Sequence, residues 1–209
     1  MPRPIIFENN SVTLWLTTIA YRKTLALVTS FSDEVGWHGT VTRIKDDEFI
    51  IEDIFVYPQE VTGSTATTDQ NAYSDWLYSL DDDTFNKLRM QGHSHVNMGV
   101  NPSGVDDKHR QQILEQLEAD MFYVFMVWNK SLSVHTLVYD MAANILCEND
   151  DVEIKLLGDE DMGEFLADAM EKVQKSGTKK NITREQLSLC DDLDYYEMYD
   201  YLEGCRWRV

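Results

Sequence analysis

The chain has 209 residues, of which 43% are hydrophobic and 11% aromatic, so its length and composition are those of a folded globular protein. It carries 18 Lys and Arg against 37 Asp and Glu, a formal net charge of −19. This excess of negative charge argues against nucleic acid as a partner, because phosphate backbones carry the same sign of charge.

The cysteines and the apolar segments bear on the compartment. Cys147, Cys190 and Cys205 lie far apart and form no C-x-x-C pair, which argues against a disulfide framework and favours a reducing environment. No apolar run has the length of a membrane span, and the N-terminus does not resemble a signal peptide. We therefore expect a soluble, cytoplasmic protein with no membrane partner.

The first part of the chain predicts a strand, a helix and a hairpin. Residues 11–16 alternate like a strand, and residues 17–29 place apolar side chains at helical spacing. Two strand-like runs, 35–44 and 49–57, flank a charged turn at 45–48 and predict a β-hairpin.

The middle of the chain is more polar. Residues 61–71 are rich in Thr, Gly, Ser and Asp without periodicity, and predict a loop. Two short helices are expected over 72–80 and 83–90, with Asp82 or Asp83 as the N-cap of the second helix.

A second strand–helix–strand unit follows. Residues 90–95 predict a strand and residues 96–102 a loop with Gly and Pro. A helix is expected over 103–119, with Ser103 as its N-cap. Residues 121–128 are continuously apolar, as expected for a strand buried on both faces.

Three further strands are expected, over 132–139, 142–147 and 152–157. The fold class predicted for residues 1–157 is therefore α/β (α+β), with a mixed, mostly antiparallel sheet flanked by helices. The composition changes near Gly158, and residues 158–209 predict an acidic, helical C-terminal appendage.

One stretch combines metal-ligand residue types at a specific spacing. His93 and His95 form an H-x-H pattern, and Ser103 and Asp106 follow as S-x-x-D after seven residues. Residues two apart on a strand point to the same side, so both imidazoles project together, and Asp106 on the first turn of the next helix can face them. Two His and one carboxylate leave a fourth position for water, which is typical of a catalytic zinc site.

Each half of this pattern also has a simpler interpretation. An H-x-H pair in a strand is more often incidental than metal-binding, and S-x-x-D before a helix resembles a capping box. The complete set of four residues at this spacing is expected by chance on the order of once in a thousand chains of this size. The combination therefore favours a metal site.

The pattern His93-Ser-His95, seven residues, Ser103-Gly-Val-Asp106 resembles the signature of the JAMM, or MPN-plus (JAB domain), zinc metallopeptidases, here of a bacterial or phage type. The order of expected elements also agrees over about residues 11–147. Glu34 stands where the family has an upstream glutamate, while Val96 departs from the proline that many members have after the second histidine. The resemblance implies a sheet flanked by helices, with an architecture related to that of cytidine deaminases.

Carried over to this chain, the resemblance implies one zinc ion bound by His93, His95 and Asp106. Glu34 would be the general base that takes a proton from the attacking water and later gives one to the leaving amine. Ser103 would hydrogen-bond the oxygen that becomes negative. The implied reaction is hydrolysis of a peptide or isopeptide bond in a protein or peptide substrate, including removal of a ubiquitin-like modifier.

The alternative is a non-catalytic MPN-type module that keeps the fold and acts as a binding or scaffold protein. Relatives of that kind usually lack metal ligands, whereas none is missing here. The complete set of ligands therefore favours the enzyme.

Other polar residues rank below these candidates. We expect a supporting role at most for His38, a surface position for His109 and a packing role for His135. Asp107 adjoins the ligand position, but the spacing favours Asp106.

Overall fold

The structure is a computed structural model that describes residues 11–62, 65–158, 169–170 and 172. The chain divides into two compact units, Met1–Leu157 and Gly158–Val209. The helices expected in the second unit fall almost entirely outside the described residues. Within the described part, every helix is too short or too polar to cross a membrane.

An eight-stranded mixed sheet forms the centre of the first unit, in the order β10-β1-β3-β2-β6-β7-β8-β9. Four of its pairings are antiparallel (β2–β3, β2–β6, β7–β8 and β8–β9), and three are parallel (β1–β3, β1–β10 and β6–β7). The strands are β1 (Val12–Leu16), β2 (Gly36–Lys45), β3 (Glu48–Phe55), β6 (Leu88–Ser94), β7 (Phe122–Trp128), β8 (Val134–Asp140), β9 (Ile145–Cys147) and β10 (Val152–Leu156). The predicted α+β class with a mixed sheet is confirmed.

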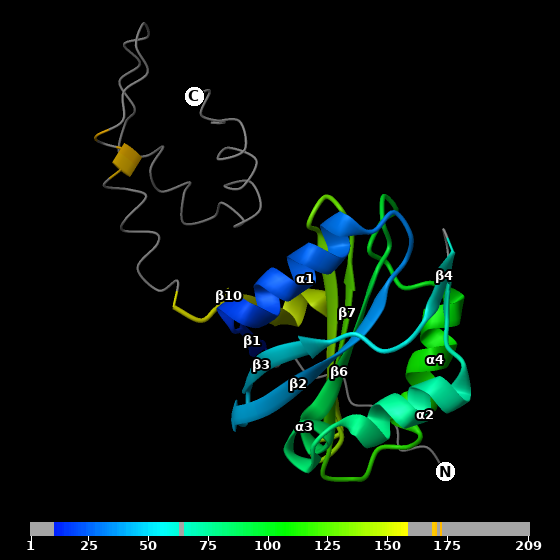
Figure 1. Cartoon of the computed structure of the whole chain (residues 1–209). Helices are drawn as coiled ribbons and strands as arrows, with labels where there is room; N and C mark the ends of the chain where they lie inside the picture. The colour runs from blue at the N-terminus through cyan, green and yellow to red at the C-terminus, as the bar shows by residue number, and fades with distance from the viewer. Residues whose placement is uncertain (1–10, 63–64, 159–168, 171, 173–209) are drawn as a thin grey trace, which may run out of the picture. The chain divides into compact units, whose positions relative to one another are not determined.

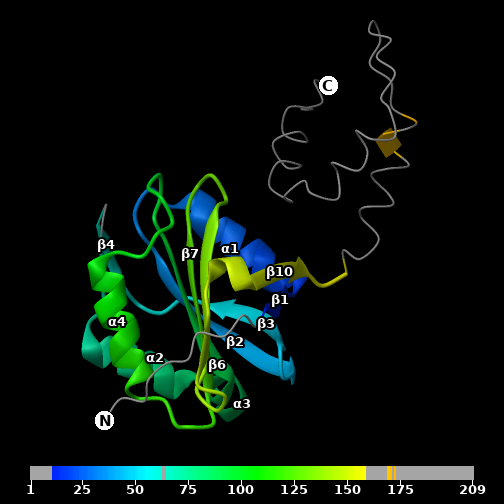
Figure 2. The same ribbon diagram turned by 180° about the vertical axis from the view of Figure 1, so that it is seen from behind.

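Helices cover both faces of the sheet. They are α1 (Thr18–Ser30), α2 (Gln70–Ser79), α3 (Asp82–Lys87) and α4 (Gly104–Leu114), and a short 3-10 helix spans Asn149–Asp151. Helix α1 lies on one side of the sheet, and α2 and α4 lie on the other (Figures 1 and 2). The three residues Ile113, Leu114 and Leu117 of the α4 region pack against a core cluster on β7, β8 and β9.

Strand β7 shows why the sequence specifies the buried centre. Its residues from Tyr123 to Trp128 are all buried, as the unbroken apolar run predicts. On the neighbouring strand β6, Gly92 leaves room for the indole of Trp37, which a Cβ at position 92 would overlap. The strand that carries the first histidine therefore lies directly against the buried Trp37.

Several expectations differ from the structure. The helix expected over 83–90 ends at Lys87, and the strand expected over 142–147 covers only Ile145–Cys147. The segment 61–71 is not simply a loop, because β4 (Glu60–Thr62) pairs antiparallel with β5 (Thr65–Thr67) in a separate two-stranded sheet. The N-cap of α3 is Asp81, whose side chain accepts from the Thr84 N–H. Helix α4 ends at Leu114, five residues before the predicted end.

Candidate metal centre

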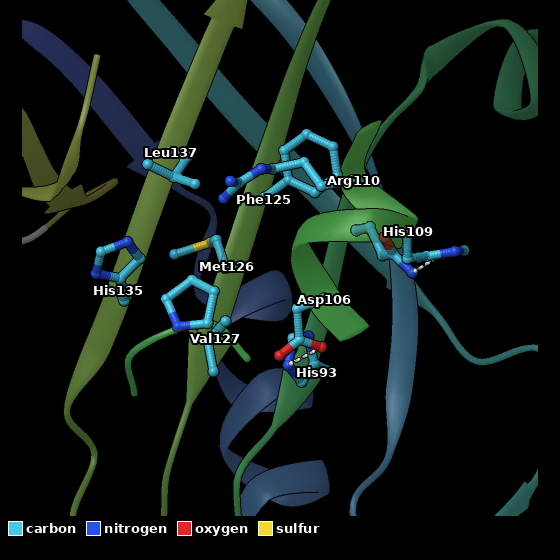
Figure 3. Close-up of a pocket in the computed structure, with 11 residues that line it drawn as sticks. His93, Asp106, His109, Arg110, Phe125, Met126, Val127, His135 and Leu137 are labelled. Atoms are coloured by element: carbon cyan, nitrogen blue, oxygen red, sulfur yellow. Dashed lines mark hydrogen bonds and ion pairs between the residues drawn. The ribbon is translucent and has the colours of Figure 1, made fainter. Parts of the chain in front are cut away.

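The three predicted ligands converge at the end of β6. His93 lies in the strand and His95 directly follows it, and their Nε2 atoms are 3.1 Å apart. Asp106 places Oδ1 at 3.3 Å from His93 Nε2 and Oδ2 at 3.5 Å from His95 Nε2. Figure 3 shows the Asp106 carboxylate on α4 facing the His93 ring. One ligand atom from each residue lies within 4.8 Å of the others.

The protein fixes the orientation of His95. The Nδ1 atom of His95 is 2.7 Å from the Gly99 carbonyl, which can only accept, so Nδ1 carries the proton. The lone pair of His95 then lies on Nε2, the atom that faces His93 and Asp106. A metal-binding histidine is commonly oriented by such a hydrogen bond on its other nitrogen. Two imidazoles and a carboxylate are a donor set that fits a divalent ion such as zinc.

Asp106 has two roles in this arrangement. It is the third residue of α4 and forms a capping box, in which Ser103 Oγ accepts from the Asp106 N–H and Asp106 Oδ2 accepts from the Ser103 N–H. Burial alone would raise the pKa of Asp106, but hydrogen bonds from His93 and Ser103 outweigh it and lower that pKa well below its ordinary value. The capping box therefore holds an ionised carboxylate beside the histidines.

Glu34 lies two residues before β2, in a segment that is joined to β6. The Val35 N–H donates to Ser94 Oγ, and the Ser94 N–H donates to the Val35 carbonyl, both at 3.0 Å. Burial raises the pKa of Glu34, the electrostatic effect of His95 and His93 opposes this rise, and Asp106 adds to it. Glu34 is thus within electrostatic reach of all three ligands, and a raised pKa suits a group that takes up and releases a proton.

Ser103 is exposed at the start of α4. Its oxygen accepts the Asp106 N–H, and its hydroxyl also hydrogen-bonds the Asp106 side chain. Because a hydroxyl group can rotate to donate to another acceptor, the N-cap role does not exclude a role in binding substrate.

The loop after His95 has a constrained start. Val96 has a φ of 47°, a left-handed conformation that is uncommon for a β-branched residue. Its carbonyl accepts from the Lys130 N–H at 2.7 Å. Proline cannot adopt this φ, so the conformation observed here is open to valine at position 96 and closed to proline.

Two lower-ranked histidines line a small cavity next to the cluster. The cavity has a volume of about 40 Å³ and is bordered by His93, Asp106, His109 and His135 (Figure 3). His109 pairs with the Gln91 amide at 2.8 Å, a partner that the sequence analysis did not identify.

The remaining candidates have other partners. Asp107 pairs with Arg110 at 2.8 Å rather than with the histidines. His38 belongs to an aromatic group on β2 and α2 instead of the ligand group. Cys147 is buried, and burial raises the pKa of its thiol, while Cys190 and Cys205 lie outside the described residues.

Comparisons with known proteins do not assign this chain to a family. No protein-family model and no curated protein matches the chain. Among solved structures, the solution structure of protein DSY2949 from Desulfitobacterium hafniense is similar at 16% identity and a TM-score of 0.47, over 69% of this chain and 92% of that one. A likeness at this level carries no argument about function.

Proposed function

We propose that this chain is a zinc-dependent peptidase or isopeptidase of the JAMM type, acting in the cytoplasm on protein or peptide substrates, including conjugates of ubiquitin-like proteins. The observation that carries the proposal is the convergence of His93, His95 and Asp106 within the electrostatic reach of Glu34. Three protein ligands leave a coordination position open, as in catalytic rather than structural zinc sites.

A zinc ion in this site would lower the pKa of water and polarise the carbonyl group of the substrate. The Glu34 carboxylate takes the proton from the attacking water. It then delivers that proton to the nitrogen of the leaving amine, for which its raised pKa is suited. The Ser103 hydroxyl donates to the carbonyl oxygen as negative charge develops there.

The proposal is tested by measuring the zinc content of the purified chain and its cleavage of ubiquitin-like fusions and short peptides. Glu34→Gln should retain zinc and lose activity by about 100- to 10,000-fold, the range expected for a general base. Asp33→Asn, which removes the neighbouring acid, is the matched control and should stay within about twofold of wild type.

A folded protein without affinity for zinc would overturn the proposal. Equal activity of Glu34→Gln and wild type would remove Glu34 from the mechanism. A folded chain that binds zinc and cleaves no substrate would favour the scaffold alternative.

A further inference from the structure

Gln59 makes an unusual pair of contacts with the backbone just after Glu34. The Gly36 N–H donates to Gln59 Oε1 at 2.8 Å, and Gln59 Nε2 donates to the Gly36 carbonyl at 2.7 Å. These partners fix the orientation of the Gln59 amide, because an N–H requires an acceptor and a carbonyl requires a donor. The side chain thus satisfies both polar groups of one residue, as a neighbouring strand would.

The pairing of the strands explains why the backbone of Gly36 needs a side chain as its partner instead of a strand. The pairing of β2 with β3 begins at His38 and Phe55, so Gly36 lies beyond the end of β3. Backbone polar groups of successive residues on a strand point to opposite edges. Those of Val35 point to Ser94 on β6, and those of Gly36 point to the opposite edge, where Gln59 takes the place of β3.

Glycine at position 36 is part of the same arrangement. A Cβ at Gly36 would overlap the hydroxyl group of Tyr57 and approach Gln59 Oε1 to 3.6 Å. A side chain at position 36 would therefore require the Tyr57 ring to shift, whereas the distance to Gln59 is that of an ordinary van der Waals contact.

Glu34 directly precedes the residues that these contacts hold. It lies outside any strand, after the bend at Ser32 and Asp33. The two residues that follow it are held by four hydrogen bonds, two with Ser94 and two with Gln59. Ser94 lies between His93 and His95 in the sequence, so the two bonds with Ser94 connect the residue after Glu34 to the chain segment that carries both histidines.

We propose that Gln59 is a positioning residue for Glu34: its amide fixes Gly36 and thereby holds the Glu34 carboxylate in place beside His93, His95 and Asp106. This inference rests on the proposed role of Glu34 as proton carrier. Gln59 itself contacts neither metal ligand nor substrate in this scheme. Its loss affects the geometry of proton transfer and leaves the ligand set intact.

The test compares Gln59→Ala and Gln59→Glu in the full chain, with Gln112→Ala, an exposed glutamine on α4, as the matched control. Gln59→Ala should lower kcat by about 10- to 100-fold, the cost of misplacing a reacting group by about 1 Å. KM should stay within twofold, and zinc content should not change. Gln59→Glu can still accept from the Gly36 N–H but cannot donate to its carbonyl, so its kcat should lie between those of wild type and Gln59→Ala.

A second readout does not depend on activity. Amide hydrogen exchange at Gly36, measured by NMR on zinc-free and zinc-loaded protein, should be faster in Gln59→Ala and unchanged in Gln112→Ala.

The proposal is overturned if Gln59→Ala keeps the wild-type kcat, if it loses zinc while folded, or if only KM changes. Unchanged exchange at Gly36 would also overturn it. A wild-type chain that binds zinc and cleaves nothing would overturn the proposed function instead, and the Gly36 exchange rates would show whether the Gln59 contacts fail as well.

Discussion

Two groups of side chains that contain histidine lie at the paired strands β2 and β6: the His38 group, on β2, and the ligand group of His93, His95 and Asp106. They differ in what faces the Nε2 atoms of their histidines. His38 on β2 pairs in register with Gln91, two residues before His93 on β6. The Nδ1 atom of His38 is 3.3 Å from the Met90 carbonyl, and its Nε2 is 2.8 Å from the Tyr73 hydroxyl. Both nitrogens of this ring are therefore satisfied within the protein.

In the ligand group, His95 has the same tautomer as His38 but different neighbours at Nε2. His95 also donates from Nδ1 to a backbone carbonyl, but its Nε2 faces another imidazole and a carboxylate instead of a hydroxyl donor. The surroundings differ as well, because His38 is enclosed by the rings of Tyr57, Tyr73 and Trp76, at 5.1 to 5.9 Å between centroids. The partner of Nε2, more than burial, therefore separates a structural histidine from a candidate metal ligand, since His95 is also buried.

The largest expected effect is the loss of zinc binding in Asp106→Asn. This change removes the charge but keeps an oxygen that can accept the Ser103 N–H, so helix α4 should still start correctly. We expect the Kd for zinc to rise more than about 1,000-fold, beyond the 10- to 100-fold typical of residues that only orient ligands. Competition with a chelator of known affinity measures this change.

Asp107→Asn is the control for that experiment. It removes an adjacent acid that pairs with Arg110, and its Kd should stay within about twofold of wild type. Equal losses in the two variants would show that general negative charge, rather than the ligand geometry, binds the ion.

A smaller effect, on the free energy of unfolding, is expected when the pH falls and the buried His38 resists protonation. Burial lowers the pKa of His38 from its ordinary value of 6.5 to about 4. Between these two values the unfolded chain binds the proton more readily than the folded one. The contribution to stability is therefore complete above about pH 6.5 and is lost as the pH falls toward 4, by about 3 kcal/mol in total.

Denaturant unfolding of the zinc-free protein between pH 4 and 7 measures this loss. His38→Gln should show a weaker decrease than wild type over the same range, and the difference between the two curves isolates the histidine from other titrating groups. Parallel curves would contradict a buried, neutral His38.

The smallest expected effect comes from Tyr73→Phe, which leaves the buried Nε2 of His38 without its partner. We expect the free energy of unfolding to fall by about 1–2 kcal/mol and the zinc affinity to stay within twofold. Tyr78→Phe, at a residue that is 89% exposed on the same helix, should change neither quantity. A loss of zinc affinity in Tyr73→Phe would show that the two histidine groups are coupled.

Much of the fold could be predicted because local patterns carry it. The apolar run of β7 and the N-cap at Ser103 are strong local signals, and both are present in the structure. The β4–β5 hairpin could not be predicted, since its strands pair in a separate sheet and need no alternation against the main core. The cap of α3 was ambiguous because Asp81, Asp82 and Asp83 offer the same carboxylate at consecutive positions.

The residues of the candidate site likewise divide into those with a signal in the sequence and those without one. His93, His95 and Asp106 could be found as candidates from residue types and spacing, because side chains of the metal-ligand types are visible in a sequence. The Gly99 carbonyl could not, since every residue offers a backbone acceptor. Gln59 has no sequence signal either, because its partner Gly36 is brought to it by the turn of the chain after β3.

The left-handed Val96 also limits how this loop can change over evolution. A mutation to proline would require φ to move from 47° to about −65°, which would turn the Val96 carbonyl away from the Lys130 N–H. The Met98 carbonyl, which accepts from the Asn129 amide at 3.0 Å, lies in the same loop. Exchange of valine for proline at position 96 is therefore not a single neutral step: it would break the backbone bond with the Lys130 N–H, and it would shift a loop that the Asn129 side chain also holds at Met98.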